Sequence, residues 1–594
     1  MQFVDEKFKD ASPVDTVNRI KDILAANGLF VTENWFDSKV NNCYSLRVTV
    51  DGTKFGTNGK GVTKELANAS AHAELMERLQ SGIIDREELT YTDEKWMDFQ
   101  ELLTNCSDFL SRICKVIKQF DHIDFSPEEL AMRCFDLEGG KEKTLALPFY
   151  NISEDKMVYV PKQLILPLFS STGNCAGNTA QEAIVQGISE IVERWFQRHF
   201  LCLDLIPPTI PEEYLRQYTR AYNTISDIRS KGYDVIVKDC SMGSGYPVIA
   251  TAVIDKRNHT YHVHLGASPI FEIALGRSLT ETFQGRTIDA VADTRLTESA
   301  KNDLKTYRKS YAVGRGAYSI NFFTENSSFP FVPFPDRTQL DNAQLLKYAV
   351  DFIKDRNMSI YIRDMSHLGF HSYKIIIPDM CKSDFDILTS SLPIARLIGD
   401  TKEAELDLQN ATIDQLFELQ MLNRYKMNSY LIDSDPRCQK LLAMPIAEDG
   451  LLDRAAGYCH LAYVEWECGN EDAAMGYAKS AQRQDVPPIS DYFSCLIQAK
   501  TMLKEECSLE SIIEKLNIFY KEETVNEVAE TLRNNLNPFR RYVVRCSRDQ
   551  GCQNCCYQEG CKVAAHRSLI RLVNSHIQNF DRDQSFTNIK KLFV

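Results

Sequence analysis

Hydrophobic and polar positions follow two different periods along the first part of the chain. The stretch at residues 12–28 has a helical period, whereas several short runs are rich in β-branched and aromatic residues and end at Gly, Pro or Asp. Runs of that second kind are typical of strands. They occupy residues 42–52, 233–240, 246–254 and 373–380. We therefore predict a mixed domain, α/β or α+β in class, over residues 1–400.

The strand pattern ends near residue 403, and helical periodicity replaces it. This periodicity is clearest at residues 413–432, 455–485 and 527–536. Within residues 455–481, the Gly469-Asn470 turn separates two helices that contain several alanines, which is similar to one tetratricopeptide unit. An ordinary helical bundle fits the same pattern. We predict an all-α, tetratricopeptide-like C-terminal domain over residues 403–594, with the bundle as the alternative.

One helical segment occurs twice in the first domain. Residues Asn58–Arg78 and Asn174–Arg194 align without a gap, and both combine a Gly-containing entry with a helix that ends in E-x-x-E-R. The shared residues are Asn58 and Asn174, Gly61 and Gly177, Thr63 and Thr179, Ala67 and Ala183, Glu74 and Glu190, Glu77 and Glu193, and Arg78 and Arg194. A single such helix most simply carries surface Glu–Arg pairs, worth about 0.2–0.5 kcal/mol each. Its duplication with the same entry favours a functional role.

The spacing places the acidic residues of each copy on one helix face. In the first copy, Ser70, Glu74 and Glu77 are spaced i, i+4, i+7. The stripe of the second copy contains Glu182, Gln186, Glu190 and Glu193. Small and apolar residues flank both stripes, so we expect the carboxylates to face a cavity, where unpaired charges are costly. Because Mg²⁺ prefers oxygen ligands and is shared with substrate phosphates, the pattern predicts a four-carboxylate site for Mg²⁺ and a nucleoside triphosphate.

A third polar helix is predicted at residues 274–286. It carries Arg277, Glu281 and Gln284 on one face and Arg286 at its end. Arginine suits a bidentate grip on phosphate oxygens, and a solvated amphipathic helix is the alternative interpretation. The Gly-rich turn at residues 57–61 contains a lysine but lacks the spacing of a P-loop. The sequence also lacks a kinase motif set and a nucleophile elbow.

Hydrophobic content and net charge indicate which classes of protein this sequence fits. Hydrophobic residues make up 44% of the 594 residues, which is enough for a large core, and the formal net charge is −14. This acidic balance argues against broad binding to nucleic acid or to an anionic membrane surface. The first residues are too charged for a signal peptide, and no run reaches the roughly 18 apolar residues of a membrane span. We expect a cytoplasmic protein without a membrane or nucleic-acid partner.

Five of the 18 cysteines are crowded near the C-terminus. They are Cys546, Cys552, Cys555, Cys556 and Cys561, with His566 following. Such a set could supply a four-ligand structural Zn²⁺ site or hold an Fe–S cluster, and we favour zinc. Because the spacing fits no common zinc finger, a helical tail without metal is the alternative.

Three segments carry a family resemblance. SAHAELMERL, NTAQEAIVQGISEIVERW and ALGRSLTETFQGR resemble, in this order, the signature segments of the YcaO family. The resemblance spans residues 1–400 and implies an ATP-dependent enzyme, without a Walker motif, that activates a peptide-backbone amide by phosphorylation. FKDAS, TNGKG, HLGASP and SHLGF are similar to bacterial members with a helical C-terminal extension. Those members are associated with β-methylthiolation of an aspartate in a small-subunit ribosomal protein, as an accessory to a radical-SAM methylthiotransferase.

The resemblance also implies ligands and site residues. It implies ATP and Mg²⁺ as cofactors and a homodimer as the assembly. The implied Mg²⁺ ligands are Glu74, Glu77, Glu190 and Glu193. The residues implied near the nucleotide are Lys9, Thr16, Ser70, Glu182, Gln186, Arg194 and Arg286, with Thr16 standing where a serine is more usual. No residue is assigned as a catalytic acid or base.

Two other functions are kept beside this hypothesis. One is an enzyme that forms azolines or thioamides on a ribosomal peptide, although the Pro-rich tail typical of peptide-cyclising members is absent from the sequence NIKKLFV. The other is a nucleotide-binding scaffold whose helical domain docks a partner without turnover of its own. Substitution of Glu77 and Glu193 separates the enzyme from the scaffold.

Overall fold

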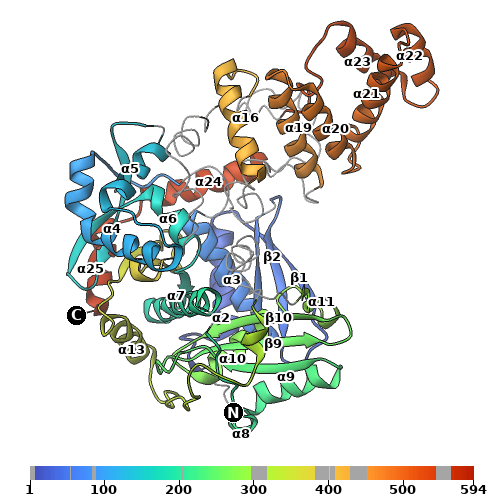
Figure 1. Cartoon of the computed structure of the whole chain (residues 1–594). Helices are drawn as coiled ribbons and strands as arrows, with labels where there is room; N and C mark the ends of the chain where they lie inside the picture. Colours follow the sequence, from blue (N-terminus) through green and yellow to red (C-terminus); the bar gives the residue numbers. More distant parts are fainter. Residues whose placement is uncertain are drawn as a thin grey trace.

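Three sheets of antiparallel strands organise the first part of the chain in the computed structural model (Figure 1). The structure describes residues 7–53, 55–82, 89–138, 140–203, 205–295, 318–381, 401, 404, 408–428, 451–543 and 563–593. All strand pairs between the described strands are antiparallel, so the mixed domain predicted from the sequence is of the α+β kind.

The first sheet has the strand order β1-β2-β3, and helix α3 covers it. Its elements are β1 (Val31–Asp37), β2 (Tyr44–Val50), β3 (Gly56–Gly61), α3 (Lys64–Ser81) and α2 (Pro13–Ala26), which packs on α3. The β2 run and the α2 helix are two of the elements that the sequence predicts. Glycines in β3 let α3 approach closely, because a Cβ atom at Gly59 would lie 2.2 Å from the Ala67 carbonyl oxygen.

The second sheet, β11-β10-β9-β8, is buried on both faces. Side chains alternate along β9, so that Val248 and Ala250 join the core beneath α7 while Ile249 and Val253 join the core beneath α9 and α10. The two-sided burial explains why this run is continuously apolar in the sequence. The elements are β8 (Asp234–Asp239), β9 (Val248–Asp255), β10 (Thr260–Ala267), β11 (Thr294–Arg295), α8 (Glu212–Leu215), α9 (Thr219–Ser230), α10 (Phe271–Thr282) and α11 (Ile288–Val291).

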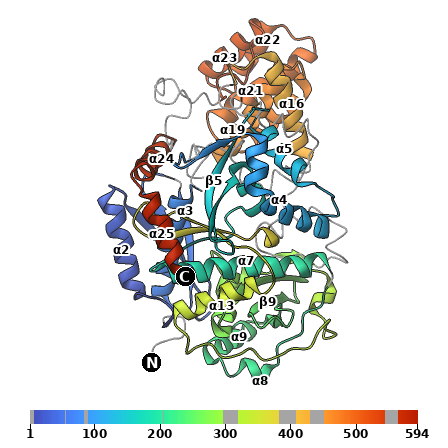
Figure 2. The ribbon, with the colours of Figure 1, turned by 90° about the vertical axis from the view of Figure 1, so that its left-hand side faces the viewer.

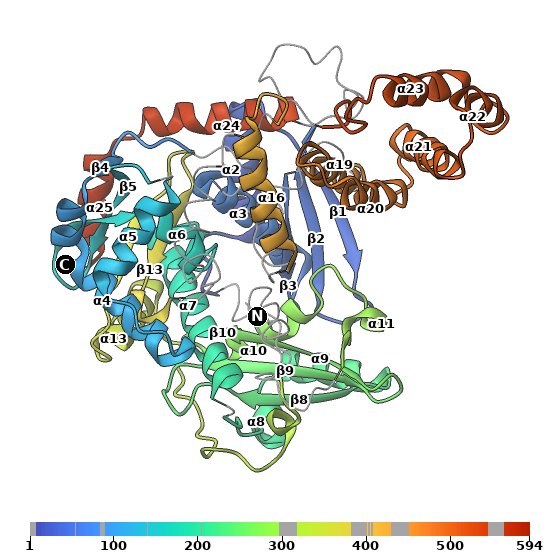
Figure 3. The same ribbon diagram turned by 45° about the horizontal axis from the view of Figure 1, so that its top comes forward.

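The third sheet lies on the other side of α7 and has the order β4-β5-β12-β13-β7, with β6 paired to β5. Its strands are β4 (Lys95–Met97), β5 (Thr144–Asn151), β6 (Lys156–Pro161), β7 (Asn174–Gly177), β12 (Tyr361–Asp364) and β13 (His371–Ile376). Its helices are α4 (Phe99–Asp121), α5 (Pro127–Leu137), α6 (Lys162–Phe169), α7 (Ala180–Cys202) and α13 (Asn342–Lys354). Helix α7 thus runs between two sheets, which accounts for its almost complete burial (Figure 3).

The elements described between residues 408 and 543 are helices, as the sequence predicts. They are α16 (Ile413–Asn428), α19 (Leu451–Glu467), α20 (Glu471–Gln482), α21 (Ile489–Lys504), α22 (Leu509–Leu516) and α23 (Glu522–Arg533). They share a core of their own, and α19–α23 extend away from the sheets (Figures 1 and 3). Only α19 and α20, joined at Gly469 and Asn470, match the predicted helix–turn–helix unit, so the tetratricopeptide interpretation is not confirmed.

Two helices that the sequence assigns to the C-terminal domain pack on the first part of the chain instead. Helix α24 (Val563–Gln578) inserts Leu569, Ile570 and Val573 into the core that also contains α2 and α3, and α25 (Arg582–Phe593) contributes Ile589 to the core beneath α7. In Figure 2, α24 lies near α2 and α3, whereas α25 contacts β5 and β12 of the third sheet. Each buried aliphatic side chain of this kind contributes roughly 1.5–3 kcal/mol.

The structure bears on the predicted cysteine site and on membrane spans only as far as its described residues extend. The five clustered cysteines, Cys546 to Cys561, lie outside them. None of the described helices combines the length and the hydropathy that a membrane crossing requires.

The close contact between β3 and α3 predicts that a larger residue at Gly59 destabilises the fold. We expect Gly59→Ala to lower the free energy of unfolding by about 3 kcal/mol, because the added methyl group would lie 2.2 Å and 2.3 Å from main-chain atoms of Ala67 and Ala71, which cannot move independently. Thermal unfolding followed by circular dichroism measures this change. Gly476→Ala on α20 is the control, since open space surrounds that position and alanine favours the helix. An unchanged midpoint in Gly59→Ala would contradict this packing.

Candidate functional site

The two repeated segments fold into the same strand–turn–helix unit. Strand β3 leads into α3 and strand β7 leads into α7. Thr63 caps α3 by accepting a hydrogen bond from the Leu66 amide, and Thr179 caps α7 by accepting one from the Glu182 amide. The repeated threonine therefore starts each helix at the same distance from its strand.

The repeated glycine and alanine explain how each helix approaches its strand. A Cβ atom at Gly61 would lie 2.5 Å from the Ala67 amide nitrogen, and one at Gly177 would lie 2.9 Å from that of Ala183. Any larger residue at these glycines would push the helix away from the strand. A third unit, β10 followed by α10, uses Gly266 in the same way. The repeat thus fixes the position of the acidic stripe on each helix.

A cavity of about 360 Å³ brings the two stripes together. It is lined by α2, α3, α7, α10 and the segment before α2. Of the residues that the sequence places at the site, those lining it are Lys9, Thr16, Ser70, Glu74, Glu77, Glu182, Gln186, Glu190, Glu193 and Arg194. Arg78, Arg277, Glu281 and Gln284 also line it. The acidic faces of the repeated helices therefore meet in one cavity, as the sequence predicts.

Glu77 and Glu193 are the buried carboxylates whose charge is least well balanced. Burial raises the pKa of each to about 7, against the opposing effect of the adjacent arginine. Neighbouring carboxylates add to this shift: Glu74 and Glu190 for Glu77, Glu281 and Glu190 for Glu193. A positive charge entering the cavity would restore both groups to the ionised form.

The arginines that end the two helices hold these glutamates from one side. Arg78 Nη2 lies 3.3 Å from Glu74 Oε1, and its Nε lies 3.6 Å from Glu77 Oε1. Arg194 Nε lies 3.9 Å from Glu193 Oε1. At 3.6 Å and 3.9 Å, the arginines balance only part of the negative charge on Glu77 and Glu193. They therefore orient these carboxylates and leave oxygen lone pairs available to a further ligand.

Glu281 on α10 differs from the other two buried carboxylates, although it lines the same cavity. Burial opposes its ionisation, but its ion pair with Lys60, together with His264 and Arg277, lowers its pKa to about 2. Lys60 lies in strand β3, so the residues that the sequence analysis interprets as a Gly-rich turn form a strand instead. Its role at the cavity depends on this pairing with α10, more than 200 residues away in the chain.

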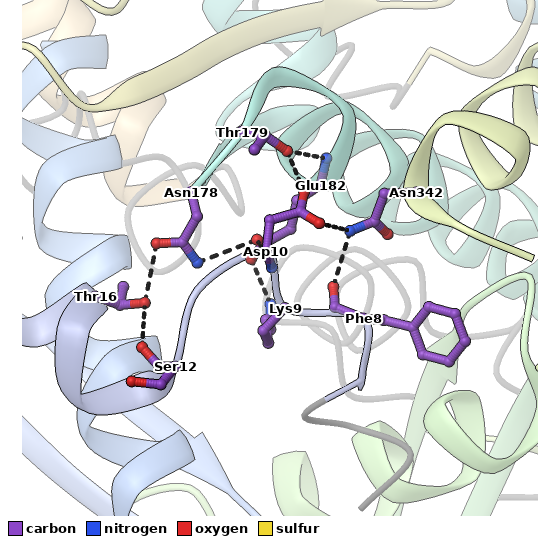
Figure 4. Close-up of polar contacts among 9 residues, drawn as sticks. All are labelled: Phe8, Lys9, Asp10, Ser12, Thr16, Asn178, Thr179, Glu182 and Asn342. Carbon is purple, nitrogen blue, oxygen red and sulfur yellow. Dashed lines mark hydrogen bonds and ion pairs between the residues drawn. The ribbon is translucent and has the colours of Figure 1, made fainter. Parts of the chain in front are cut away.

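The start of α7 holds a network around Glu182 (Figure 4). Lys9 Nζ lies 3.0 Å from one carboxylate oxygen, while the Asp10 amide at 3.0 Å and Asn178 Nδ2 at 3.1 Å donate to the other. Thr16 Oγ1 lies 2.9 Å from Asn178 Oδ1. Although burial opposes ionisation, Lys9 and these donors lower the pKa of Glu182. Glu182 is therefore a charged group that orders the cavity wall.

The chemistry of the donor set fits Mg²⁺. Glu74, Glu77, Glu190 and Glu193 offer hard oxygen ligands, and the raised pKa of two of them indicates a missing positive charge. Within the described residues, no three His, Cys, Asp or Glu side chains form a group that could hold a metal ion by themselves. The four glutamates line one cavity without converging on a single point, so an ion here needs further oxygens from a substrate, as Mg²⁺ sites commonly use phosphates.

Arg286 differs from the other predicted site residues because it is not part of the cavity lining. Its Nη1 lies 3.0 Å from Asp293 Oδ2 instead. The residues that the sequence analysis missed are Lys60, Asn178 and Asp10. Asn178 could have been identified from its position between Gly177 and Thr179, which both belong to the repeat.

Known proteins share this sequence and fold to different extents. The chain is 29% identical over 391 residues to the ribosomal protein S12 methylthiotransferase accessory factor YcaO of Escherichia coli (strain K12), which covers 63% of this chain and 65% of that protein, just under two thirds. It is 28% identical over 431 residues to an uncharacterised protein of Haemophilus influenzae, covering 68% of this chain and 70% of that protein.

Solved structures show weaker similarity. A heterocyclase in complex with substrate and cofactor has a TM-score of 0.45 at 18% identity, covering 63% of this chain and 53% of that one. The YcaO structure from Methanopyrus kandleri bound with AMPPCP and Mg²⁺ has a TM-score of 0.40 at 16% identity, covering 64% of this chain and 94% of that one.

The family profile for YcaO cyclodehydratases, described as binding ATP and Mg²⁺, matches residues 58–381. This range is more than half of the 594 residues, and it contains both repeated helices and the third polar helix. The chain therefore belongs to the YcaO family.

Proposed function

We propose that this protein uses ATP and Mg²⁺ to activate a peptide-backbone amide by phosphorylation, as a step in the modification of a small-subunit ribosomal protein. One observation carries the proposal: Glu77 and Glu193, from two copies of the same helix, are buried in one cavity with their pKa values raised to about 7. Such a pair favours a bound cation, and the family is described as binding Mg²⁺ together with ATP.

The chain's own residues bind and orient the reactants. Bound Mg²⁺ supplies the positive charge that neutralises the glutamates and the phosphates. Glu74, Glu77, Glu190 and Glu193, which line the cavity, would hold this ion. Arg194 and Lys9 are the cavity cations that we assign to phosphate oxygens, since phosphoryl transfer depends mainly on positioning and charge stabilisation. The remaining residues that we assign to the nucleotide are Thr16, Ser70, Glu182 and Gln186.

The proposed reaction has two steps. The amide oxygen attacks the γ-phosphorus of ATP, and the bond to the β-phosphate oxygen breaks to release ADP. For azoline or thioamide formation, a nucleophile then adds to the activated amide carbon and gives up its proton, and the phosphate leaves with the former amide oxygen. The burial of Glu77 and Glu193 limits the access of water to this part of the cavity.

The substrate proposal comes from the E. coli relative, which is named an accessory factor of a ribosomal protein S12 methylthiotransferase. We propose that the present chain assists the β-methylthiolation of an aspartate in a ribosomal protein beside a radical-SAM methylthiotransferase. Because that name describes an accessory, a scaffold that binds nucleotide without turnover is the second candidate. The cyclodehydratase description of the family favours azoline or thioamide formation as the third.

The substrate proposal predicts a change in the cell's ribosomes. In a strain that lacks this protein, we expect intact-mass measurement of small-subunit ribosomal proteins to reveal one protein lighter by a single methylthio group in part of its population. Re-expression of the chain restores the modified mass. Fully modified ribosomal proteins in the deletion strain would contradict this substrate.

The metal-site proposal predicts the effect of two shape-preserving substitutions. We expect Glu77→Gln and Glu193→Gln each to lower Mg²⁺-dependent ATP turnover about 100-fold or more, because loss of even an outer-shell partner of a metal commonly costs 10–100-fold. The folded state should be as stable as the wild type without ligand, since each substitution removes an unbalanced buried charge. ATP turnover and thermal unfolding are measured on the same samples.

Glu65→Gln is the matched control for these variants, since Glu65 is an exposed glutamate on the same helix α3. Full ATP turnover in both cavity variants would contradict the proposed metal site. Lost turnover with full ribosomal-protein modification in cells would instead favour the scaffold.

The raised pKa values predict a pH dependence of stability. Glu77 and Glu193 have folded-state pKa values of about 7, above the ordinary value of 4.5, so their protonated forms stabilise the fold. That stability is fully present below pH 4.5 and is lost as the pH rises through 7. We expect the unfolding midpoint of the ligand-free wild type, relative to the Glu77→Gln/Glu193→Gln double variant, to fall between pH 5 and pH 8. Parallel midpoint curves for the two proteins would contradict the assignment.

A further inference from the structure

The segment from Lys7 to Ser12 forms part of the cavity wall without belonging to a sheet or a long helix. Phe8 and Lys9 line the cavity, and helix α2 begins only at Pro13. A segment without main-chain ladders keeps its place only through individual contacts, which must offset the entropy of ordering it. The contacts of this segment therefore decide whether the wall is closed at this point.

Asp10 makes the contacts that connect this segment to two helices at once (Figure 4). Its Oδ1 accepts a hydrogen bond from Asn342 Nδ2 at 2.9 Å, and its Oδ2 accepts one from the Thr179 hydroxyl. Thr179 is the N-cap of α7, and Asn342 is the first residue of α13. The negative carboxylate thus sits where two helices begin, which is electrostatically favourable.

Each of the two side chains that donate to Asp10, Thr179 and Asn342, also makes a second hydrogen bond, which fixes its orientation. The Thr179 hydroxyl accepts from the Glu182 amide while it donates to Asp10, so its single proton is committed to the carboxylate. Asn342 Nδ2 also donates to the Phe8 carbonyl oxygen at 3.2 Å. Asp10 is therefore matched to its surroundings as an acceptor at both oxygens, a role that neither an amide nor an alanine can fill.

The main chain of Asp10 connects this anchor to the cavity. Its amide donates to Glu182 Oε2, and the neighbouring Lys9 reaches the other oxygen of the same carboxylate. Asp10 itself does not line the cavity, whereas Lys9 does, with its side chain 36% exposed. Holding Asp10 in place therefore holds the Lys9 ammonium at the edge of the cavity.

We propose that Asp10 is a positioning residue that clamps the N-terminal segment across the cavity and thereby presents Lys9 to the phosphates of the nucleotide. This inference rests on the proposed function, because it takes the occupant to be a nucleoside triphosphate. Asp10 touches neither the nucleotide nor the reacting atoms. It acts by keeping the wall of the site closed, so its contribution is the same in the ground state and in the transition state of phosphoryl transfer.

Asp10→Ala in the full chain tests the clamp. We expect the KM for ATP and the Kd for a fluorescent ATP analogue with Mg²⁺ to rise about tenfold, with kcat within about twofold of the wild type, because a uniform binding interaction is removed. Asp10→Asn should give an intermediate value, since one oxygen can still accept from Thr179 while the bond to Asn342 is lost. Asp22→Ala, an exposed aspartate on α2 outside the cavity lining, should leave all three constants unchanged.

Limited trypsin digestion measures the clamp without ATP turnover. We expect cleavage after Lys7 or Lys9, detected by intact mass, to be several-fold faster in Asp10→Ala than in the wild type and Asp22→Ala. Equal cleavage rates together with equal ATP affinity would overturn the inference. A wild type that binds no Mg²⁺-ATP analogue would overturn the proposed function instead, and the trypsin comparison without nucleotide still decides whether Asp10 clamps the segment.

Discussion

Two negative charges that the protein balances only in part, on Glu77 and Glu193, are the constraint on which the rest of this structure depends. Burial and neighbouring carboxylates push both groups toward their neutral forms. Glu281, in the same cavity, escapes this because Lys60 is its partner. The difference between these three acids separates the groups that await a ligand from those that the fold already satisfies. A cation in the cavity would thus shift both groups toward the ionised state at neutral pH.

The packing of the repeated helices serves this constraint. Close approach of α3 to β3 and of α7 to β7 needs glycine on each strand and alanine on each helix. Because α7 is covered by sheets on two sides, Glu182 and Glu193 of its acidic stripe are buried where they line the cavity. The repeated glycines and alanines therefore bury the two helices, and this burial raises the free energy of ionising their carboxylates.

Sequence periodicity was sufficient to predict helices and strands where residues close together in the chain determine the local structure. The predicted helix at residues 12–28 and the runs that became β2, β8, β9 and β13 are examples. The i, i+4, i+7 spacing also placed Glu74 and Glu77 on one face, which a helix dictates. The glutamate stripes were predictable for this reason, and both line the cavity.

Contacts between distant segments were not predictable in this way. Lys60 gains its role from a partner on α10, and Asp10 from the starts of α7 and α13, none of which local spacing encodes. The helix predicted over residues 274–286 ends at Thr282 in the structure, so Arg286 lies beyond it, pairs with Asp293 and is not part of the cavity lining. Helix α24 was covered only by the general prediction of a helical domain over residues 403–594, which did not indicate which core receives it.

The return of α24 and α25 to the first part of the chain has a consequence for biosynthesis. Leu569, Ile570 and Val573 complete a core whose other members, such as Leu24 and Leu75, are translated about 500 residues earlier. Until α24 has been synthesised, the earlier members of this core lack the contacts that it supplies. The helices between residues 408 and 543 share a separate core, which can form before α24 and α25 complete the cores of the first part of the chain.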